Sequence, residues 1–184
     1  NALSESLDLE IHRDGKIFSQ KYERGVPLAP LAAVGETKRR GTIIHFKPDA
    51  DIFETTTFDF DVLSNRLRET AFLTRDLRIT LEDERSDTTN VFHFKDGLLD
   101  FVNYLNAKKK PLHPPVYFKK QKGDVVIECV LQYNTSYSES LFSFANNINT
   151  HDGGTHVVGF RKALTRTINA YAKEKGFLKN FKLP

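Results

Sequence analysis

Alternating apolar and polar positions open the chain. Residues 7–13 place Leu and Ile on one side and charged groups on the other, as expected for a strand with one buried face. An Asp-Gly pair at 14–15 follows, and residues 16–23 alternate again, so the two runs predict a β-hairpin. Residues 24–40 carry Pro and Gly and predict a loop, whereas residues 41–49 predict a third strand closed by a proline.

The hydrophobic period then lengthens to that of a helix. Within residues 58–73, four apolar side chains spaced three or four apart share one stripe that runs from Phe60 to Ala71. Two further strands are predicted at residues 77–84 and 90–94, on either side of a polar turn. The first part of the chain therefore combines antiparallel strands with one amphipathic helix.

The order of elements changes near Gly97, and we place a domain boundary there, between residues 1–96 and 97–184. A short helix opens the second part and stops in a segment rich in Lys and Pro. Three strands are then predicted to form an antiparallel meander, at residues 115–120, 124–134 and 138–147. A last helix begins at about Thr155. These elements predict an α+β fold rather than a doubly wound parallel sheet.

The last helix has two chemically different sides. Five apolar residues share one face: Val157, Phe160, Leu164, Ile168 and Tyr171. Four basic residues share the opposite half: Arg161, Lys162, Arg166 and Lys173. One interpretation is a surface helix with a solvated charged side, and the other is a side that faces nucleic-acid phosphates.

The start of this helix holds two glycines, at 153 and 154, which allow a tight turn. Asp152 or Thr155 is expected to cap the first free N–H groups. A P-loop would need Gly-Lys-Ser/Thr after the glycines, and residues 153–159 read GGTHVVG. The pattern therefore excludes a mononucleotide P-loop at this position.

Composition adds limits rather than an activity. The formal net charge is only +3, but acidic residues gather in 49–87 and basic residues in the last 24 positions. Cys129 is the single cysteine, which excludes an internal disulfide, and the sequence shows no Cys/His cluster typical of zinc. No apolar run is long enough to span a membrane, so we expect a soluble, intracellular chain.

Two further positions are candidates for binding. Thr42, Ile44 and Phe46 share one face of their strand, where a hydroxyl among apolar groups can hold the polar edge of a flat ligand such as a base. Ordinary strand propensity explains the same residues. Arg13 ends the apolar face of residues 7–13, where a buried cation is costly, so we expect it at a rim or in a salt bridge.

Longer strings in the sequence resemble a known family, the B subunits of DNA gyrase and the closely related topoisomerase IV. They are RDGKIFSQKYERGVPLAPL, GTIIHFKPD, RLRETAFL, GLLDFVNYLN and GGTHVVGFRKALTRTINAYA. The resemblance runs from end to end, and the last string is highly specific to type IIA topoisomerases. RLRETAFL and GFRKALTRTINAYA favour gyrase over topoisomerase IV.

The resemblance implies the C-terminal half of a GHKL (Bergerat) ATPase sandwich. A transducer domain with a left-handed β-α-β crossover follows it, and the boundary at Gly97 coincides with the junction in the family. Thr42 matches the threonine that hydrogen-bonds the adenine edge, Ile44 an apolar neighbour in that pocket, and Gly41 the adjoining glycine. Arg13 matches an arginine at the mouth of the pocket, which aminocoumarin-type inhibitors contact.

In the second domain, Arg161 matches a transducer arginine that faces the cavity through which captured DNA passes. Lys162 and Arg166 are neighbours with the same implied role. The implied ligands and partners are ATP with Mg²⁺, a DNA duplex, the A subunit of gyrase, a second copy of the B subunit, and aminocoumarin-type inhibitors. The implied location is a bacterial cytoplasm or an organelle of bacterial origin. The resemblance implies no association of the protein with a membrane.

The family's catalytic glutamate, magnesium ligand and phosphate lid match no position here and are expected before Asn1. The lysine that reaches the γ-phosphate is expected after Pro184. We therefore assign no catalytic and no metal-binding residue, and expect this chain alone not to hydrolyse ATP.

Other interpretations remain open. The chain can belong to topoisomerase IV, and the basic helix alone fits a non-enzymatic DNA-binding domain. A heat-shock or mismatch-repair ATPase shares the GHKL core, but GGTHVVGFRKAL argues against it.

Overall fold

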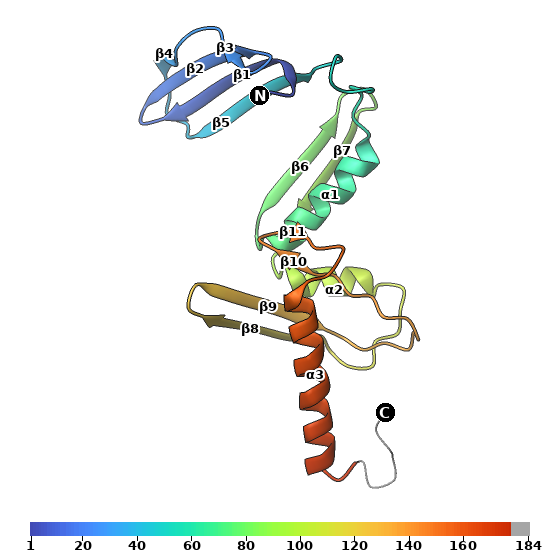
Figure 1. Cartoon of the computed structure of the whole chain (residues 1–184). Coiled ribbons are helices and arrows are strands. Elements are labelled where there is room, and N and C mark those ends of the chain that lie inside the picture. The colour runs from blue at the N-terminus through green and yellow to red at the C-terminus, as the bar shows by residue number, and fades with distance from the viewer. Residues whose placement is uncertain (178–184) are drawn as a thin grey trace. The chain divides into compact units, whose positions relative to one another are not determined.

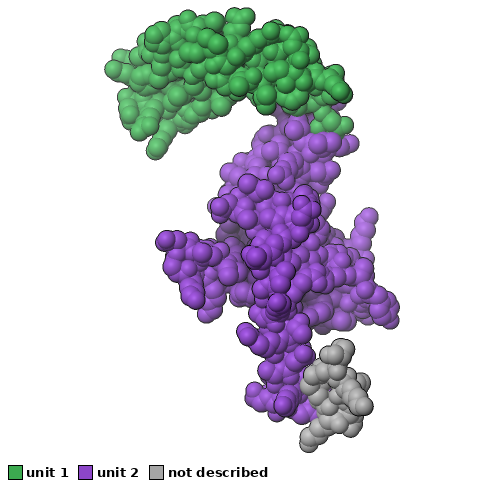
Figure 2. All heavy atoms as spheres, viewed as in Figure 1, with its two compact units in different colours: residues 1–59 green, residues 60–184 purple. Residues whose placement is uncertain are grey.

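The structure, a computed structural model, describes residues 1–177 in two compact units. Unit 1 is Asn1–Asp59 and unit 2 is Phe60–Pro184 (Figure 2). The end of the predicted basic C-terminus, residues 178–184, lies outside the described residues. The predicted domain boundary at Gly97 is a different division of the chain and stays a prediction.

Unit 1 is an antiparallel sheet (Figure 1). Its strands are β1 Ser4–Arg13, β2 Lys16–Glu23, β3 Val26–Pro27, β4 Ala32–Glu36 and β5 Gly41–Pro48. The strand order is β3-β2-β1-β5, and β4 also pairs with β2. The predicted hairpin is confirmed: β1 pairs with β2 through a turn in which Asp14 and Gly15 both have positive φ, 53° and 78°.

The loop predicted for residues 24–40 is wrong in part, because β3 and β4 form within it. Both short strands pair with the edge of β2 that β1 leaves free, one near each end. Pro27 is tolerated there because an edge strand does not need every backbone N–H for pairing.

A buried carboxylate closes one end of this sheet. Asp49 is only 3% exposed, and it accepts hydrogen bonds from the guanidinium of Arg24 (Nε to Oδ2, 2.9 Å) and from the backbone N–H of Asp51 (3.0 Å). Its own backbone N–H donates to the carbonyl of Leu3 at 3.1 Å. Hydrogen bonds to Asp51 and the charges of both carboxylates raise the pKa of Arg24. The contacts tie the start of β1, the end of β2 and the end of β5 together.

The described residues of unit 2, 60–177, form three helices and paired strands (Figure 1). Its elements are α1 Phe60–Leu73, β6 Arg78–Asp83, β7 Thr88–His93, α2 Leu98–Leu105, β8 Val116–Lys122, β9 Val125–Leu131, β10 Phe144–Ala145, β11 Ile148–Asn149 and α3 Thr155–Glu174. The strands form three separate two-stranded antiparallel sheets: β6-β7, β8-β9 and β10-β11.

Aromatic rings form the core of unit 2. Phe72, at the end of α1, stacks on Phe94 with ring centroids 3.7 Å apart and on Phe101 of α2 at 5.1 Å. Phe101 also contacts Phe142 at 5.4 Å and Phe144 of β10 at 6.3 Å. This cluster therefore joins α1, α2 and the segment that leads toward α3.

The third strand predicted for residues 138–147 is wrong. Among the described residues, β8 and β9 pair only with each other, and β10 covers just Phe144–Ala145. Asn146 and Asn147 both adopt the left-handed backbone conformation, with φ of 49° and 65°, which Asn tolerates better than most residues. The two asparagines turn the chain directly into β11.

Helix α3 begins at Thr155 as predicted, but neither expected residue caps it. Gly154 holds the N-cap position without a side-chain hydrogen bond. The imidazole of His156 lies over this glycine, where an added Cβ would come within 2.8 Å of the ring. The Thr150 hydroxyl holds the same ring at 3.2 Å. The expected capping by Asp152 or Thr155 is therefore wrong, because a histidine ring occupies this side of the turn.

The α+β class is confirmed, with antiparallel pairing throughout the described residues. The left-handed β-α-β crossover needs parallel strands in one sheet. Residues 1–177 contain no parallel pair, so the crossover stays a prediction.

Replacing Gly97 by alanine is expected to lower the free energy of unfolding of unit 2 by about 1–3 kcal/mol. Gly97 has φ 58° and ψ −114°, a combination that residues with a Cβ avoid, and the added carbon would lie 3.3 Å from the carbonyl oxygen of Phe72. Urea denaturation followed by circular dichroism measures the change.

Gly159→Ala is the matched control. Gly159 lies inside α3 with open space around its missing Cβ, so alanine there is expected to be neutral or stabilising by up to about 1 kcal/mol. Equal unfolding midpoints for Gly97→Ala and the unmodified chain would contradict the strain argument.

Candidate functional site

The predicted nucleotide-pocket residues lie together on one face of the unit 1 sheet. Thr42 of β5 is opposite Ile11 of β1, and Ile44 is opposite Leu9. Because cross-strand partners point to the same side, these four side chains form one continuous patch. Gly41 precedes them at the beginning of β5, opposite His12.

This patch has the chemistry of a wall for a flat ligand. Ile44 and Phe46 are 57% and 47% exposed, so the apolar surface on β5 is accessible within unit 1. The Thr42 hydroxyl is the polar group among them, and Phe58 contacts Phe46 edge to face at 6.1 Å. A base edge that offers a donor or acceptor can meet the hydroxyl while its ring lies over the aliphatic groups.

Arg13 lies at the end of β1, two residues beyond the partner of Thr42 and on the same face. Its side chain is mostly exposed, and its Nε lies 3.3 Å from a carboxylate oxygen of Asp14. Arg13 therefore points outward and forms a salt bridge, as predicted, whereas its position at the rim of a pocket stays a prediction. Such an exposed pair contributes little stability and leaves the guanidinium free to exchange partners.

The opposite face of the sheet holds a contact that the sequence reasoning missed. His12 lies between Glu10 and Thr37: its Nε2 is 2.6 Å from the carboxylate, and its Nδ1 is 3.0 Å from the hydroxyl. This arrangement attaches the segment after β4 to β1. The alternation of β1 puts residues 10 and 12 on one side, but nothing in the sequence points to Thr37 as the third member.

The basic residues of α3 are not equivalent. The prediction that Arg161 shares the side opposite the apolar face is wrong: at 100° per residue it lies about 100° from Lys162 around the helix and borders the apolar stripe. Its guanidinium forms a hydrogen-bonded ion pair with Glu139. Lys162 and Arg166 are exposed, and within the described part of the chain they form no ion pair. Glu139 lies in residues 138–147, which the sequence predicted as a strand. No signal in the sequence identified Glu139 as the partner of Arg161.

A hollow of about 550 Å³ lies beside this ion pair, within unit 2. Its lining residues include Arg161 and three acidic residues, Glu69, Glu139 and Asp152. Acidic residues therefore outnumber arginine and lysine in the lining of the hollow.

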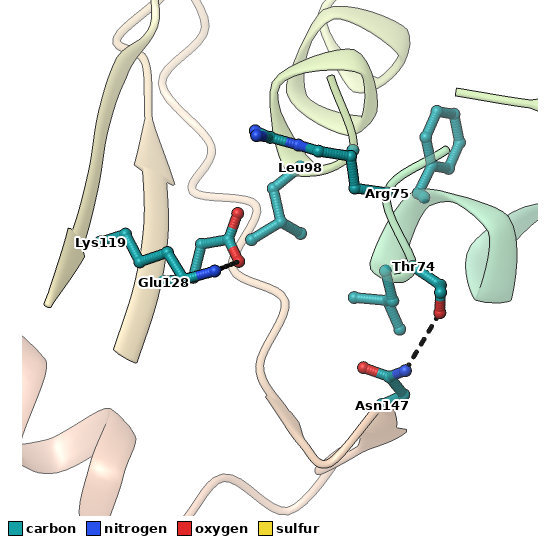
Figure 3. Close-up of a pocket in the computed structure, with 9 residues that line it drawn as sticks. Thr74, Arg75, Leu98, Lys119, Glu128 and Asn147 are labelled. Carbon is teal, nitrogen blue, oxygen red and sulfur yellow. Dashed lines mark hydrogen bonds and ion pairs between the residues drawn. The ribbon is translucent and has the colours of Figure 1, made fainter. Parts of the chain in front are cut away.

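A second hollow, of about 260 Å³, lies between the end of α1, the start of α2 and the β8-β9 hairpin (Figure 3). Its lining residues form a salt bridge and a hydrogen bond. Lys119 lies 4.0 Å from the carboxylate of Glu128, and the Asn147 amide donates to the Thr74 hydroxyl at 3.2 Å. Nearby, partial burial raises the pKa of Tyr117, and the adjacent carboxylate of Glu128 raises it further.

Other reactive groups do not gather into a site. Within residues 1–177, no three His, Cys, Asp or Glu side chains lie close enough to hold a metal ion. Cys129 of β9 is partly buried, and this burial raises the pKa of its thiol and disfavours the reactive thiolate. No helix of the described chain is both long and apolar enough to cross a membrane.

The chain is similar to known proteins along its whole length. The family described as "DNA gyrase B" matches residues 97–183. The sequence is 50% identical to the DNA gyrase B subunit of Bacillus mycoides over 98% of this chain and 45% of that protein. It is 48% identical to the B subunit of DNA topoisomerase 4 from Staphylococcus epidermidis (strain ATCC 35984), over 98% of this chain and 28% of that protein.

Two solved structures share the fold. The 43K ATPase domain of Thermus thermophilus gyrase B, crystallised with an aminocoumarin, superposes with a TM-score of 0.85 at 35% identity, covering all of this chain and 50% of that one. The gyrase B-subunit structure from Myxococcus xanthus gives 0.84 at 33% identity, over 95% and 51%. The chain thus spans about half, or less than half, of the length of these relatives. On these similarities, the chain belongs to the DNA gyrase B family.

Proposed function

We propose that this chain is part of the ATPase subunit of DNA gyrase, which uses ATP to supercoil DNA by passing one duplex through another. Membership of the gyrase B family supports this proposal, together with the patch that Thr42 and Ile44 form on the unit 1 sheet. We assign residues 1–96 to the ATPase domain and residues 97–184 to the transducer, and place the protein in the bacterial cytoplasm.

Unit 1 supplies one wall of the nucleotide pocket in this proposal. Gly41, Thr42 and Ile44 would lie against the adenine, with the Thr42 hydroxyl toward its polar edge. Arg13, on the same face of the sheet, would lie at the rim, where an aminocoumarin-type inhibitor is held. The ATPase domain of the Thermus thermophilus relative was crystallised with an aminocoumarin, which supports an inhibitor site in the complete ATPase domain.

The intact enzyme is proposed to use ATP with Mg²⁺, and the metal supplies positive charge to the phosphates. The family residue that helps to hold magnesium matches no position of this sequence. We therefore assign to this chain no metal ligand and no catalytic residue, and derive no hydrolytic step from it.

The basic side of α3 is proposed to contact the DNA backbone. Lys162 and Arg166 are exposed, and Arg161 is also exposed but lies closer to the apolar stripe of the helix. Contacts of this kind hold DNA through its phosphates and do not read its sequence. The proposed partners are a DNA duplex, the A subunit of gyrase and a second copy of the B subunit.

Topoisomerase IV is the second candidate, because a relative of that name is 48% identical over nearly the whole chain. The two candidates differ in their product. With ATP and its A subunit, the complete protein carrying this sequence is expected to supercoil relaxed plasmid DNA, as agarose gels would show. Decatenation without supercoiling would identify it as topoisomerase IV instead.

Thr42→Ala is expected to weaken ATP and aminocoumarin binding to the complete ATPase subunit by roughly 5- to 10-fold, because one hydrogen bond to the ligand is lost. Isothermal titration calorimetry measures the change. Thr42→Ser keeps the hydroxyl and should bind almost normally. Ser19→Ala, on the other face of the sheet, is a second control. Unaltered affinity in Thr42→Ala would reject the assignment of Thr42 to the pocket.

Arg161→Gln is expected to slow duplex passage more than it weakens ATP binding, because Arg161 contacts DNA and not the nucleotide. Supercoiling rates and ATP affinity, measured on the same preparation, separate the two effects. Arg161→Lys keeps the charge and should retain most of the passage rate. A normal passage rate in Arg161→Gln would remove Arg161 from the DNA contact.

A further inference from the structure

Arg161 differs from its neighbours in having a carboxylate partner. Its Nη2 donates to Oε1 of Glu139, and the side chains of the two residues are 54% and 60% exposed. Lys162 and Arg166, in the described part of the chain, pair with no carboxylate. One of the three residues proposed to contact DNA is therefore already neutralised.

The residues that follow Glu139 attach its segment to the rest of unit 2. On its C-terminal side, Phe142 packs against Phe101 at 5.4 Å, and the hydroxyls of Ser143 and Thr150 lie 2.6 Å apart. Next to it, Lys109 donates to the Ser140 hydroxyl at 3.4 Å. The segment that carries Glu139 is thus attached to the core of unit 2 and to the start of α3.

The surroundings favour this pairing over a phosphate. Glu69 and Asp152 line the same hollow as the ion pair, so a phosphate at Arg161 would lie in a region with three acidic residues. Glu69 itself lies 3.4 Å from Arg66 and is partly compensated, whereas Glu139 contacts Arg161 directly. Glu139 is therefore the carboxylate that most opposes a phosphate at this position.

The ion pair between Arg161 and Glu139 is weak enough for a DNA phosphate to compete with it. Exposed ion pairs contribute little, since water and salt screen both charges. A phosphate contact gains in addition from the release of counterions along DNA. A duplex can therefore displace Glu139 from Arg161, but only at some cost in affinity.

We propose that Glu139 competes with a DNA phosphate for the guanidinium of Arg161 and so lowers the affinity of this part of α3 for DNA. The inference rests on the proposed DNA contact of Arg161 and adds its regulation. In the bound state the guanidinium leaves Glu139 and takes a phosphate oxygen. In the absence of DNA the ion pair re-forms and keeps Arg161 from binding other anions.

Fluorescence anisotropy tests the proposal, with the full 184-residue chain and a short labelled DNA duplex of mixed sequence. Glu139→Gln is expected to tighten binding by roughly two- to fivefold at low salt, the size of an exposed ion pair. The gain should shrink as salt rises. Arg161→Gln is expected to weaken binding, and adding Glu139→Gln to it should then change nothing further.

Glu84→Gln is the control for simple loss of negative charge. Glu84 is exposed in the turn between β6 and β7, where its neighbours Asp83 and Arg85 pair with each other, and it lies far in sequence from α3, so its substitution should leave affinity nearly unchanged. Circular dichroism of each variant checks that the fold is retained.

Three results would overturn the proposal, and they differ in what else they reject. If Arg161→Gln weakens binding but Glu139→Gln does not tighten it, the competition fails and the DNA contact stands. If the Glu139→Gln gain persists without Arg161, the carboxylate acts by general repulsion and not through this guanidinium. If Arg161→Gln leaves DNA affinity unchanged, the inference and the proposed DNA contact fail together.

Discussion

The stacking of Phe72 on Phe94 and Phe101 is the contact on which unit 2 depends. Phe72 and Phe101 are almost fully buried, and their rings bring together the end of α1, the residue after β7 and the middle of α2. Aromatic rings bury large areas and prefer defined mutual geometry, so the cluster orients these elements as well as holding them. Small two-stranded sheets are only marginally stable alone, and packing against the helices stabilises them.

The same cluster positions chemistry that lies far away in sequence. Phe142 and Phe144 pack on Phe101, and these contacts hold the segment on which Glu139 lies. The turn after β10 then returns the chain to Thr150, whose hydroxyl supports the first turn of α3. A core of apolar rings thereby determines which carboxylate a surface arginine meets.

The sequence pattern predicted the features that depend on residues close together in the chain. The Asp14-Gly15 turn, the stripe of α1 and the start of α3 follow from backbone preferences and helical period, and the structure has all three. The pair between Arg161 and Glu139 is different, because 22 positions separate the residues and only the tertiary fold joins them. The strand expected at 138–147 failed for a related reason: its apolar residues serve the aromatic core, and two asparagines reverse the chain. The proposed roles of Thr42 in the nucleotide pocket and of Arg161 in the DNA cavity came from the family resemblance, not from the hydrophobic and polar pattern.

Helix α3 meets the rest of unit 2 near one end, and none of its side chains, all of them described, is buried. With 20 residues it is about 30 Å long, and the glycines at 153 and 154 stand at its base. A change of backbone torsion at these glycines would rotate the whole helix about its first residue. A rotation of about 10° would displace the far end by about 5 Å, and Arg161, nearer the start, by about a third of that distance. A small torsional change at Gly153 and Gly154 would therefore move Lys173, near the far end, much more than Arg161.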